Sequence, residues 1–390
     1  MMSQIHNILF LHQSADLYGS DKVLLAIVSR LKGSRFHPIV VVPVDGPLVG
    51  ELRRAGVECH VVPLTRLSRG IMSARGLLGI PGEMAHSFRE IDTLLQGRPV
   101  SLLHSNTLAI LTGALWARQR RVPHVWHVHE IIVHPRFVKI IYGYLLKWFA
   151  DRIVCISQAT QANLVEDQPS LQSRCRLVWN GLCRSGKTNL AAISAYRKSL
   201  QVERNEVLLA LVGRINRWKG QLLLVEAAGL LWQRGVRDFR IAIVGSVVPG
   251  QEHFLHSLER AIAVSPAAAR ISVQSFTSEV WAVWDSCDIA VIPSTEPEPF
   301  GMVALEAMSA GKPVVAADHG GLTEIVVPGQ TGWLVPPCDA SALADALQQA
   351  ITDPALRQRM GQAGLARYLA EFTLGRQMHD LVAVYDELVH

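Results

Sequence analysis

The chain has 390 residues, of which 49% are hydrophobic and 18% are charged. This length exceeds that of one ordinary domain, and the composition supports sizeable cores, so we predict two domains. No uncharged apolar run reaches the roughly eighteen residues of a transmembrane helix, which excludes an ordinary membrane-spanning protein. The net charge of +5 would suit nucleic acid, anionic lipid or an anionic substrate, but no nucleic-acid-binding motif is present.

The compartment is predicted from the N-terminus and the cysteines. Residues 1–7 lack the charged start and apolar middle of a signal peptide. The six cysteines show no paired metal-ligand spacing, and we interpret them as reduced thiols of a cytoplasmic protein. They are Cys59, Cys155, Cys175, Cys183, Cys287 and Cys338.

Apolar segments in the first half predict strands that alternate with helices. Residues 7–12 predict a strand, 13–20 a polar loop with Gly19, and 21–31 an amphipathic helix. Further strands are predicted at 38–43, 57–62, 100–104 and 123–129. This alternation is typical of a doubly wound parallel sheet. The first strand, glycine loop and helix would form a phosphate cradle, although a purely structural glycine is the alternative.

The fifth predicted strand is rich in histidine. His127 and His129 would share one face of the strand and His124 would take the other. A zinc site would need a further ligand and a carboxylate, for which His134 and Glu130 are available, but we predict no metal. Ligand sites of parallel sheets lie at the carboxyl ends of strands, which favours His129 as a site residue.

Polar residues also end the preceding strand. His104 and Asn106 are candidates to line a ligand site, although such residues can also serve only to satisfy local backbone groups.

Two basic, apolar segments of the first half allow two interpretations each. Residues 65–84, which include Arg66, Arg69 and Arg75, predict a mobile loop with a helix beside the ligand site, or a solvated connection. Residues 135–149 predict a core helix with a solvated cationic stripe, or an interfacial membrane helix. Arg136, Lys139 and Lys147 would form the cationic stripe. The second interpretation predicts reversible contact with an anionic membrane.

The second half begins near residue 206 with another strand–loop–helix unit. Residues 207–213 predict a strand and 221–233 a helix, and the loop between them carries Arg214, Arg217 and Lys219. Surface cations are usually only solvated, whereas a diphosphate needs at least two that converge. Later strands are predicted to end at Gly245 and just before Phe276.

The most informative stretch runs from Ser294 to Gly321. A buried strand precedes it, Pro297 and Pro299 bar regular structure in the turn, and a helix follows Gly301. A glycine at that point would leave room for a ligand, and the helix start favours a phosphate. Glu298 in the turn and Glu306 in the helix could contact different parts of one nucleotide ligand. The alternative is a buried strand–helix unit with two solvated glutamates.

Residues 293–333 resemble the retaining glycosyltransferases of the GT-B fold, family 4 (glycosyl transferases group 1). The resemblance lies in Glu-Pro-Phe-Gly at 298–301, Leu-Glu-Ala-Met at 305–308, Gly-Lys-Pro-Val-Val-Ala at 311–316 and Gly-Gly-Leu-Thr-Glu-Ile-Val at 320–326. Weaker similarity covers residues 5–385. At the domain junction, however, Trp179 and Cys183 replace the family's Pro and Asp.

The resemblance implies an α/β GT-B fold of two doubly wound Rossmann-like domains that face each other across a cleft. An acceptor-side domain would span 1–181 and a nucleotide-sugar-binding domain 182–372. A C-terminal helix at 373–390 would return to the first domain.

The resemblance also implies site residues. The catalytic residues would be His129, Arg214, Lys219 and Glu298. Donor binding would use Gly19, Gly213, Arg214, Lys219, Gly245, Phe276, Glu298, Phe300, Gly301, Met302, Val303 and Glu306. The acceptor side would involve Tyr18, His104 and Asn106. No metal and no cofactor would be required.

The resemblance therefore implies a retaining, metal-independent glycosyltransferase. It would move a sugar from a nucleotide-diphosphate sugar to a saccharide or lipid-linked acceptor in bacterial surface polysaccharide biosynthesis. Nucleotide-sugar 2-epimerases also have the GT-B fold and are one alternative, although they lack this combination of motifs. A non-catalytic, donor-binding subunit of a partner transferase is the other alternative. The expected location is cytoplasmic, with peripheral contact at the inner face of the membrane as a further expectation.

Overall fold

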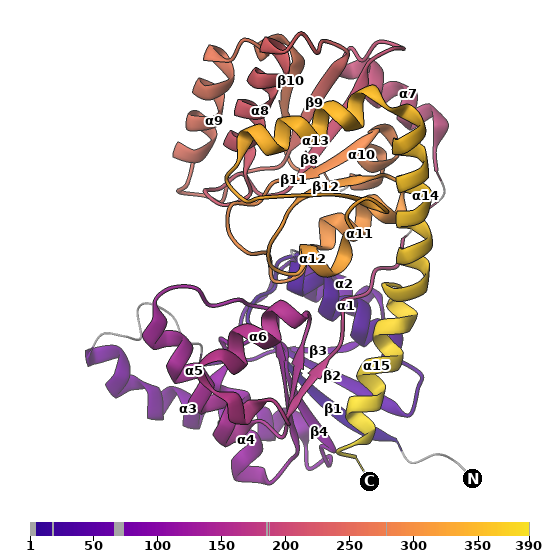
Figure 1. The fold of residues 1–390 in the computed structure, drawn as a ribbon. Helices are drawn as coiled ribbons and strands as arrows, with labels where there is room; N and C mark the ends of the chain where they lie inside the picture. The colour runs from indigo at the N-terminus through magenta and orange to yellow at the C-terminus, as the bar shows by residue number, and fades with distance from the viewer. Residues whose placement is uncertain are drawn as a thin grey trace. The chain divides into compact units, whose positions relative to one another are not determined.

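The computed structural model describes residues 5–17, 19–65, 74–184, 186, 188–277 and 279–389, with only the backbone described for 74–79. The chain divides into two compact units. The first comprises Met1–Gly181 with Leu374–His390, and the second comprises Leu182–Thr373. Figure 1 shows the two units in a continuous colour ramp, with the last helix in yellow.

Among the described residues of the first unit, seven parallel strands form one sheet in the order β3-β2-β1-β4-β5-β6-β7. The strands are β1 (His6–Leu11), β2 (Phe36–Val42), β3 (Glu58–Val61), β4 (Leu102–Ser105), β5 (His124–Val128), β6 (Arg152–Cys155) and β7 (Cys175–Leu177). The central strands are almost continuously apolar because helices cover both faces, and Ile8 to Leu11 are fully buried.

The helices of the first unit lie in two layers. One layer contains α1 (Gly19–Leu31), α2 (Pro47–Arg54) and the C-terminal α15 (Leu374–Asp386). The other contains α3 (Ala74–Leu95), α4 (Leu111–Arg120), α5 (Arg136–Phe149) and α6 (Gln158–Asp167). The predicted helix at 21–31 begins two residues earlier, so Gly19 belongs to the first turn of α1 and not to the loop.

In the described part of the second unit, six parallel strands follow the order β10-β9-β8-β11-β12-β13. They are β8 (Val207–Val212), β9 (Phe239–Val244), β10 (Ile271–Gln274), β11 (Ile289–Ile292), β12 (Val314–Ala317) and β13 (Gly332–Val335). The helices are α7 (Leu190–Ser199), α8 (Gln221–Gln233), α9 (His253–Val264), α10 (Val280–Ser286), α11 (Met302–Ser309), α12 (Leu322–Ile325), α13 (Ala340–Thr352) and α14 (Pro354–Glu371).

Each sheet has one point where the strand order reverses, between β1 and β4 in the first unit and between β8 and β11 in the second. Loops leave the carboxyl ends of these strands in opposite directions, and the crevice between them is where doubly wound sheets bind ligands. The fold therefore marks the loops after β8 and β11, and those after β1 and β4, as candidate site loops. No described helix is both long and apolar enough to cross a membrane.

Candidate active site

The loop after β8 is fixed by its own side chains. The Asn216 carboxamide oxygen accepts hydrogen bonds from the backbone N–H groups of Trp218 (3.1 Å) and Lys219 (3.0 Å). Gly220 has a φ of +77°, and a Cβ there would lie 1.9 Å from the Pro293 carbonyl oxygen. Glycine is therefore required at this close approach to the loop after β11. These contacts direct Lys219 toward that loop.

Glu298 receives two hydrogen bonds on one carboxylate oxygen. Lys219 Nζ lies 2.6 Å from Glu298 Oε1, and the Ser294 hydroxyl donates to the same atom at 2.6 Å. Glu298 and Ser294 are both buried. The Lys219 ammonium also lies 4.3 Å from the centre of the Trp218 ring. The pair Lys219–Glu298 thus joins the two candidate loops at the switch point.

The glycine pair after β12 holds the backbone of the Glu298 turn. The Gly321 N–H donates to the Glu298 carbonyl oxygen at 2.8 Å. A Cβ at Gly320 would lie 2.4 Å from that oxygen, and a Cβ at Gly321 would lie 2.5 Å from Phe300 Cα. Side chains at either position would displace the turn. Gly320 and Gly321 therefore position Glu298 through backbone packing.

Gly301 caps α11 with a φ of +121°, a conformation that favours glycine. We expected a Cβ here to obstruct a ligand, but the atoms it would meet belong to α12, with Leu322 Cδ2 at 2.6 Å. The first-turn N–H groups of α11, including those of Met302 and Val303, lack intrahelical acceptors and suit an anion. The Phe300 side chain is buried against Phe372 and so serves packing.

Glu306 lies on α11 and is oriented by a tryptophan. The indole N–H of Trp284, on α10, donates to Glu306 Oε2 at 2.9 Å. Trp284 is fully buried, so its ring cannot reorient without disturbing the core. The direction of the Glu306 carboxylate is therefore set by a residue of another helix.

The remaining predicted donor residues lie at neighbouring strand ends. A Cβ at Gly245 would lie 1.9 Å from the Gly213 carbonyl oxygen, so glycine permits this contact between the loops after β9 and β8. The Arg214 carbonyl accepts from Gln221 at 2.8 Å. The Phe276 N–H donates to Ser246 Oγ at 3.0 Å, and the Phe276 side chain is 58% exposed. Arg217, which we did not assign, is ion-paired with Glu296.

A second polar cluster occupies the switch point of the first unit. His12 Nε2 lies 2.6 Å from Asp21 Oδ1, and Ser14 donates to the same carboxylate. The Asn106 amide nitrogen lies 3.1 Å from His12 Nδ1. Asn106 thus directly follows β4, beside the end of β1, as its position in the sequence suggested.

His104 does not line a ligand surface, contrary to our expectation. It is fully buried within β4, where the Tyr385 hydroxyl of α15 lies 2.8 Å from its Nδ1. Its Nε2 lies 3.2 Å from His127 Nδ1, and the His127 ring is 4.2 Å from that of His129. His129 follows the last residue of β5, and its Nε2 is buried with no partner among the described residues.

Burial sets the charge of this histidine cluster. It lowers the pKa of His124 to about 4 and those of His104, His127 and His129 well below the usual value. Neighbouring histidines lower the last three further, so the cluster is neutral near pH 7. Burial also raises the pKa of Glu130 to about 7. The described residues include no group of three or more side chains placed to hold a metal ion.

The two other first-unit residues that we predicted carry less information. Gly19 has ordinary backbone geometry, and a Cβ there would meet nothing within 4 Å, so the conformation does not require glycine. Tyr18 lies outside the described residues.

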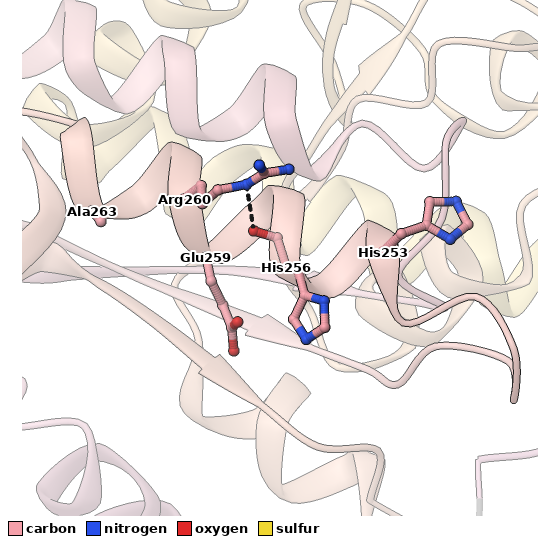
Figure 2. A pocket seen from close by; sticks show the side chains of 5 residues that line it. All are labelled: His253, His256, Glu259, Arg260 and Ala263. Carbon is pink, nitrogen blue, oxygen red and sulfur yellow. Dashed lines mark hydrogen bonds between the residues drawn. The ribbon is translucent and has the colours of Figure 1, made fainter.

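A cavity of about 590 Å³ lies apart from all of these residues. His253, His256, Glu259, Arg260 and Ala263 line it, and Figure 2 shows that they follow one another along α9. The dashed line in the figure is the bond from Arg260 Nε to the His256 carbonyl oxygen, 3.3 Å long. The cavity contains none of the predicted site residues.

Sequence reasoning missed three contributors to the site. Ser294 begins the key stretch, and its burial beside Glu298 could have been suspected from that position. Trp284 precedes Glu306 by 22 residues on another helix, a spacing that carries no signal. The pairing of His12 with Asp21 joins the end of β1 to the start of α1, and no motif or spacing in the sequence indicates it.

Known protein families match both units. Residues 19–183 match the family model described as Glycosyltransferase Family 4, and residues 193–367 match Glycosyl transferases group 1. Among curated proteins, the D-inositol 3-phosphate glycosyltransferase of Corynebacterium diphtheriae is 33% identical over 195 residues, 49% of this chain and 45% of that protein. The D-inositol 3-phosphate glycosyltransferase of Kribbella flavida is 37% identical over 180 residues, which are 44% of this chain and 42% of that protein. The chain thus spans less than half the length of these relatives.

Solved structures share the whole fold. Anabaena Alr3699/HepE in complex with UDP and glucose has a TM-score of 0.85 at 24% identity, with 98% of this chain and 100% of that chain covered. WaaG, a glycosyltransferase involved in lipopolysaccharide biosynthesis, has a TM-score of 0.69 at 15% identity, with 98% and 99% covered.

The two-unit fold is that of GT-B glycosyltransferase structures. More particularly, the first half of the chain matches the family 4 domain model and the second half matches the group 1 domain model.

Proposed function

We propose that the chain transfers a sugar, with retention of configuration and without a metal ion, from a nucleotide-diphosphate sugar to a saccharide or lipid-linked saccharide. One observation carries the proposal. At the switch point of the second unit, Lys219 and Glu298 meet beside the N-terminus of α11. A cation, a carboxylate and a helix start at one strand edge suit an anionic leaving group attached to a polyhydroxylated sugar.

Donor binding would use the second unit. The carboxylate of Glu306, oriented by Trp284, would accept hydrogen bonds from the ribose hydroxyls. The N–H groups at the start of α11 would meet the diphosphate or the sugar. The exposed ring of Phe276 would lie against the base. UDP and UDP-glucose are bound in structures of Anabaena Alr3699/HepE, which supports a nucleotide-sugar donor.

Arg214 and Lys219 would stabilise the departing diphosphate as its charge develops, which acts on the transition state. Glu298 would hold sugar hydroxyls and stabilise an oxocarbenium-like centre, with His129 beside the transferred sugar. The acceptor hydroxyl would attack the face that the leaving group vacates, which retains configuration. Its proton would pass to the leaving diphosphate, since no separate base is assigned.

We consider two classes of acceptor, each suggested by a different observation. The resemblance suggests a saccharide or lipid-linked precursor of a bacterial surface polysaccharide, made in the cytoplasm by an enzyme in peripheral contact with the membrane. The curated relatives are D-inositol 3-phosphate glycosyltransferases, which makes an inositol phosphate the second candidate acceptor.

The test is a thermal-shift screen of nucleotide sugars that begins with UDP-glucose, followed by transfer assays with both acceptor classes. A ligand at 100 times its dissociation constant stabilises the protein by about 2.7 kcal/mol, which is readily detected. We expect one donor to bind and to be transferred with its anomeric configuration retained. Interconversion of free donor would establish the epimerase alternative, and binding without transfer or hydrolysis would establish the non-catalytic subunit.

A further inference from the structure

One face of α5 exposes a continuous row of large apolar side chains. The α5 stripe consists of Phe137, Ile140, Ile141, Tyr144 and Trp148, all of them exposed. Their spacing of three and four residues places them along one side of the helix, whereas Tyr142 and Leu146 pack into the core on the other. Isolated exposed apolar residues are ordinary, but a contiguous row indicates an interaction surface.

Cations gather at the C-terminal end of this stripe. A cavity of about 400 Å³ is lined by Trp148 together with Arg118, Arg121 and Arg174. It lies at the amino-terminal edge of the sheet, beside the start of β5, and so away from the strand ends that carry the candidate site. Trp148, with 64% of its surface exposed, joins the apolar stripe to this arginine cavity.

These arginines retain their charge for a partner. Within the described residues, neither Arg118 nor Arg121 takes part in an ion pair, and both are exposed. Arg174 donates only to carbonyl oxygens, those of Lys147 and Ala150. Asp151 also lines the cavity, and its carboxylate, which accepts from the backbone N–H of His124, offsets one of the three positive charges.

The cationic stripe expected along α5 is solvated only in part, because Arg136 and Lys147 are exposed whereas Lys139 is buried. Lys139 is buried and pairs with Glu166 and Asp167, and Arg136 pairs with Asp167 at 3.3 Å. Arg66 and Arg69, which we also expected to contribute, lie outside the described residues, as does the side chain of Arg75. The uncompensated charge therefore lies at the Trp148 end.

We propose that the α5 stripe and the arginine cavity form a docking surface for an anionic phospholipid bilayer. The apolar side chains would enter the boundary between headgroups and acyl chains, where Trp and Tyr are favoured. The arginines would bind lipid phosphates. A second copy of the chain fits less well, because a twofold contact through this face would bring its unpaired arginines together. This proposal specifies the membrane contact suggested above and is independent of sugar transfer.

The test is co-sedimentation of the 390-residue chain with vesicles of phosphatidylglycerol or of phosphatidylcholine. We expect binding to the anionic vesicles that decreases with salt, and little binding to the neutral ones. Arg118→Glu with Arg121→Glu should weaken binding about tenfold or more, because each cation near an anionic surface is worth about a fivefold change. Arg260→Glu with Arg359→Glu changes the net charge equally at exposed positions of the second unit and should have a smaller effect.

The apolar α5 stripe is tested with a double variant of its own and a matched control double variant. Ile141→Ser with Trp148→Ser should abolish most binding, whereas Leu190→Ser with Val264→Ser, at exposed apolar positions of the second unit, should not. All variants should keep the wild-type thermal shift with UDP-glucose or UDP, or the wild-type melting temperature if neither binds. Equal binding to both vesicle types, or no binding at low salt, would overturn the proposal. So would a self-association in solution that the Ser variants of the stripe remove.

Discussion

The ammonium group of Lys219 and the carboxylate of Glu298 are partners, with Nζ 2.6 Å from Oε1. The contact links the loop after β8 to the loop after β11 and is reinforced by the Ser294 hydroxyl on the same oxygen. If Lys219 serves the leaving diphosphate and Glu298 serves the sugar, the donor must share or replace this pair. Charge-assisted bonds of this kind hold both groups in place before the donor arrives.

Changing Glu298 to Gln should chiefly lower kcat. The amide keeps the shape of the side chain but loses the charge that would stabilise a developing oxocarbenium centre, an interaction of the transition state. Steady-state kinetics with the donor found in the screen would measure this. Glu296→Gln is the matched control, since that carboxylate lies in the same turn and pairs with Arg217. An unchanged kcat in Glu298→Gln would remove Glu298 from the catalytic residues.

Replacing Arg214 and Lys219 together by Ala should reduce kcat/KM at least about a hundredfold. Donors aimed at developing negative charge are worth about 2.7–4 kcal/mol each, and two would be lost. Arg217→Ala in the same loop is the control and should stay close to the wild type. Because loss of Lys219 leaves the Glu298 carboxylate buried, the melting temperature should be recorded as well. A well-folded double variant with wild-type kcat/KM would contradict the leaving-group role.

The fold could be predicted because its signal is local. Strands buried on both faces read as continuous apolar runs, and their alternation with helices defines a doubly wound sheet. Element boundaries were predicted less accurately, because Gly19 and Ser20 were predicted as loop but form the first turn of α1. His104 was misplaced for a similar reason. β4 extends to Ser105, so His104 points into the interior toward Tyr385.

The candidate site could be predicted only in part. Lys219 and Glu298 each stood out within a motif, but their mutual contact depends on how two loops meet, and the sequence does not encode that locally. The hydrogen bond from Trp284 to Glu306 joins two helices, and no periodic pattern in the sequence indicates it. The α5 stripe was visible as an apolar helix, yet which of its faces is exposed depends on the packing of α6 and the sheet.

Glu306→Gln should weaken donor binding and leave kcat nearly unchanged, because the contact with ribose already exists in the ground state. Trp284→Phe keeps most of the packing but removes the N–H that orients Glu306, so it should raise the donor KM by about tenfold, as expected for a bond to a charged group. Combining the two changes should cost less than their sum, since they act on one interaction. Additive effects in the double variant would show that Trp284 acts independently of Glu306.

Transfer should survive excess EDTA. Arg214, Lys219 and the N-terminus of α11 would supply the positive charge that a divalent ion supplies in metal-dependent transferases. Initial rates before and after chelation, with magnesium and manganese restored separately, provide the measurement. Strict dependence of the rate on either added ion would contradict the metal-free mechanism.

The first unit should lose stability on acidification before the second. Burial lowers the pKa of His124 to about 4 and those of His104, His127 and His129 well below about 6.5, their value in an unfolded chain. Their contribution to the free energy of unfolding is thus present above about pH 6.5 and is lost as the pH falls toward the folded pKa values. Glu130, with a raised pKa of about 7, acts in the opposite direction, because its contribution is lost as the pH rises.

On unfolding, the four buried histidines take up protons and Glu130 releases one, so the net uptake is about three protons at most. The stability of the first unit should therefore fall as the pH drops below about 6.5, because each proton taken up on unfolding adds about 1.36 kcal/mol per pH unit to the slope. Urea unfolding between about pH 7.5 and 5.5, with hydrogen exchange to separate the units, would measure this slope. His124→Gln should reduce the slope by about one proton even if it lowers stability overall. If protection is lost first in the second unit, or if the slope in the first unit is flat, the buried histidines do not take up protons as the cluster requires.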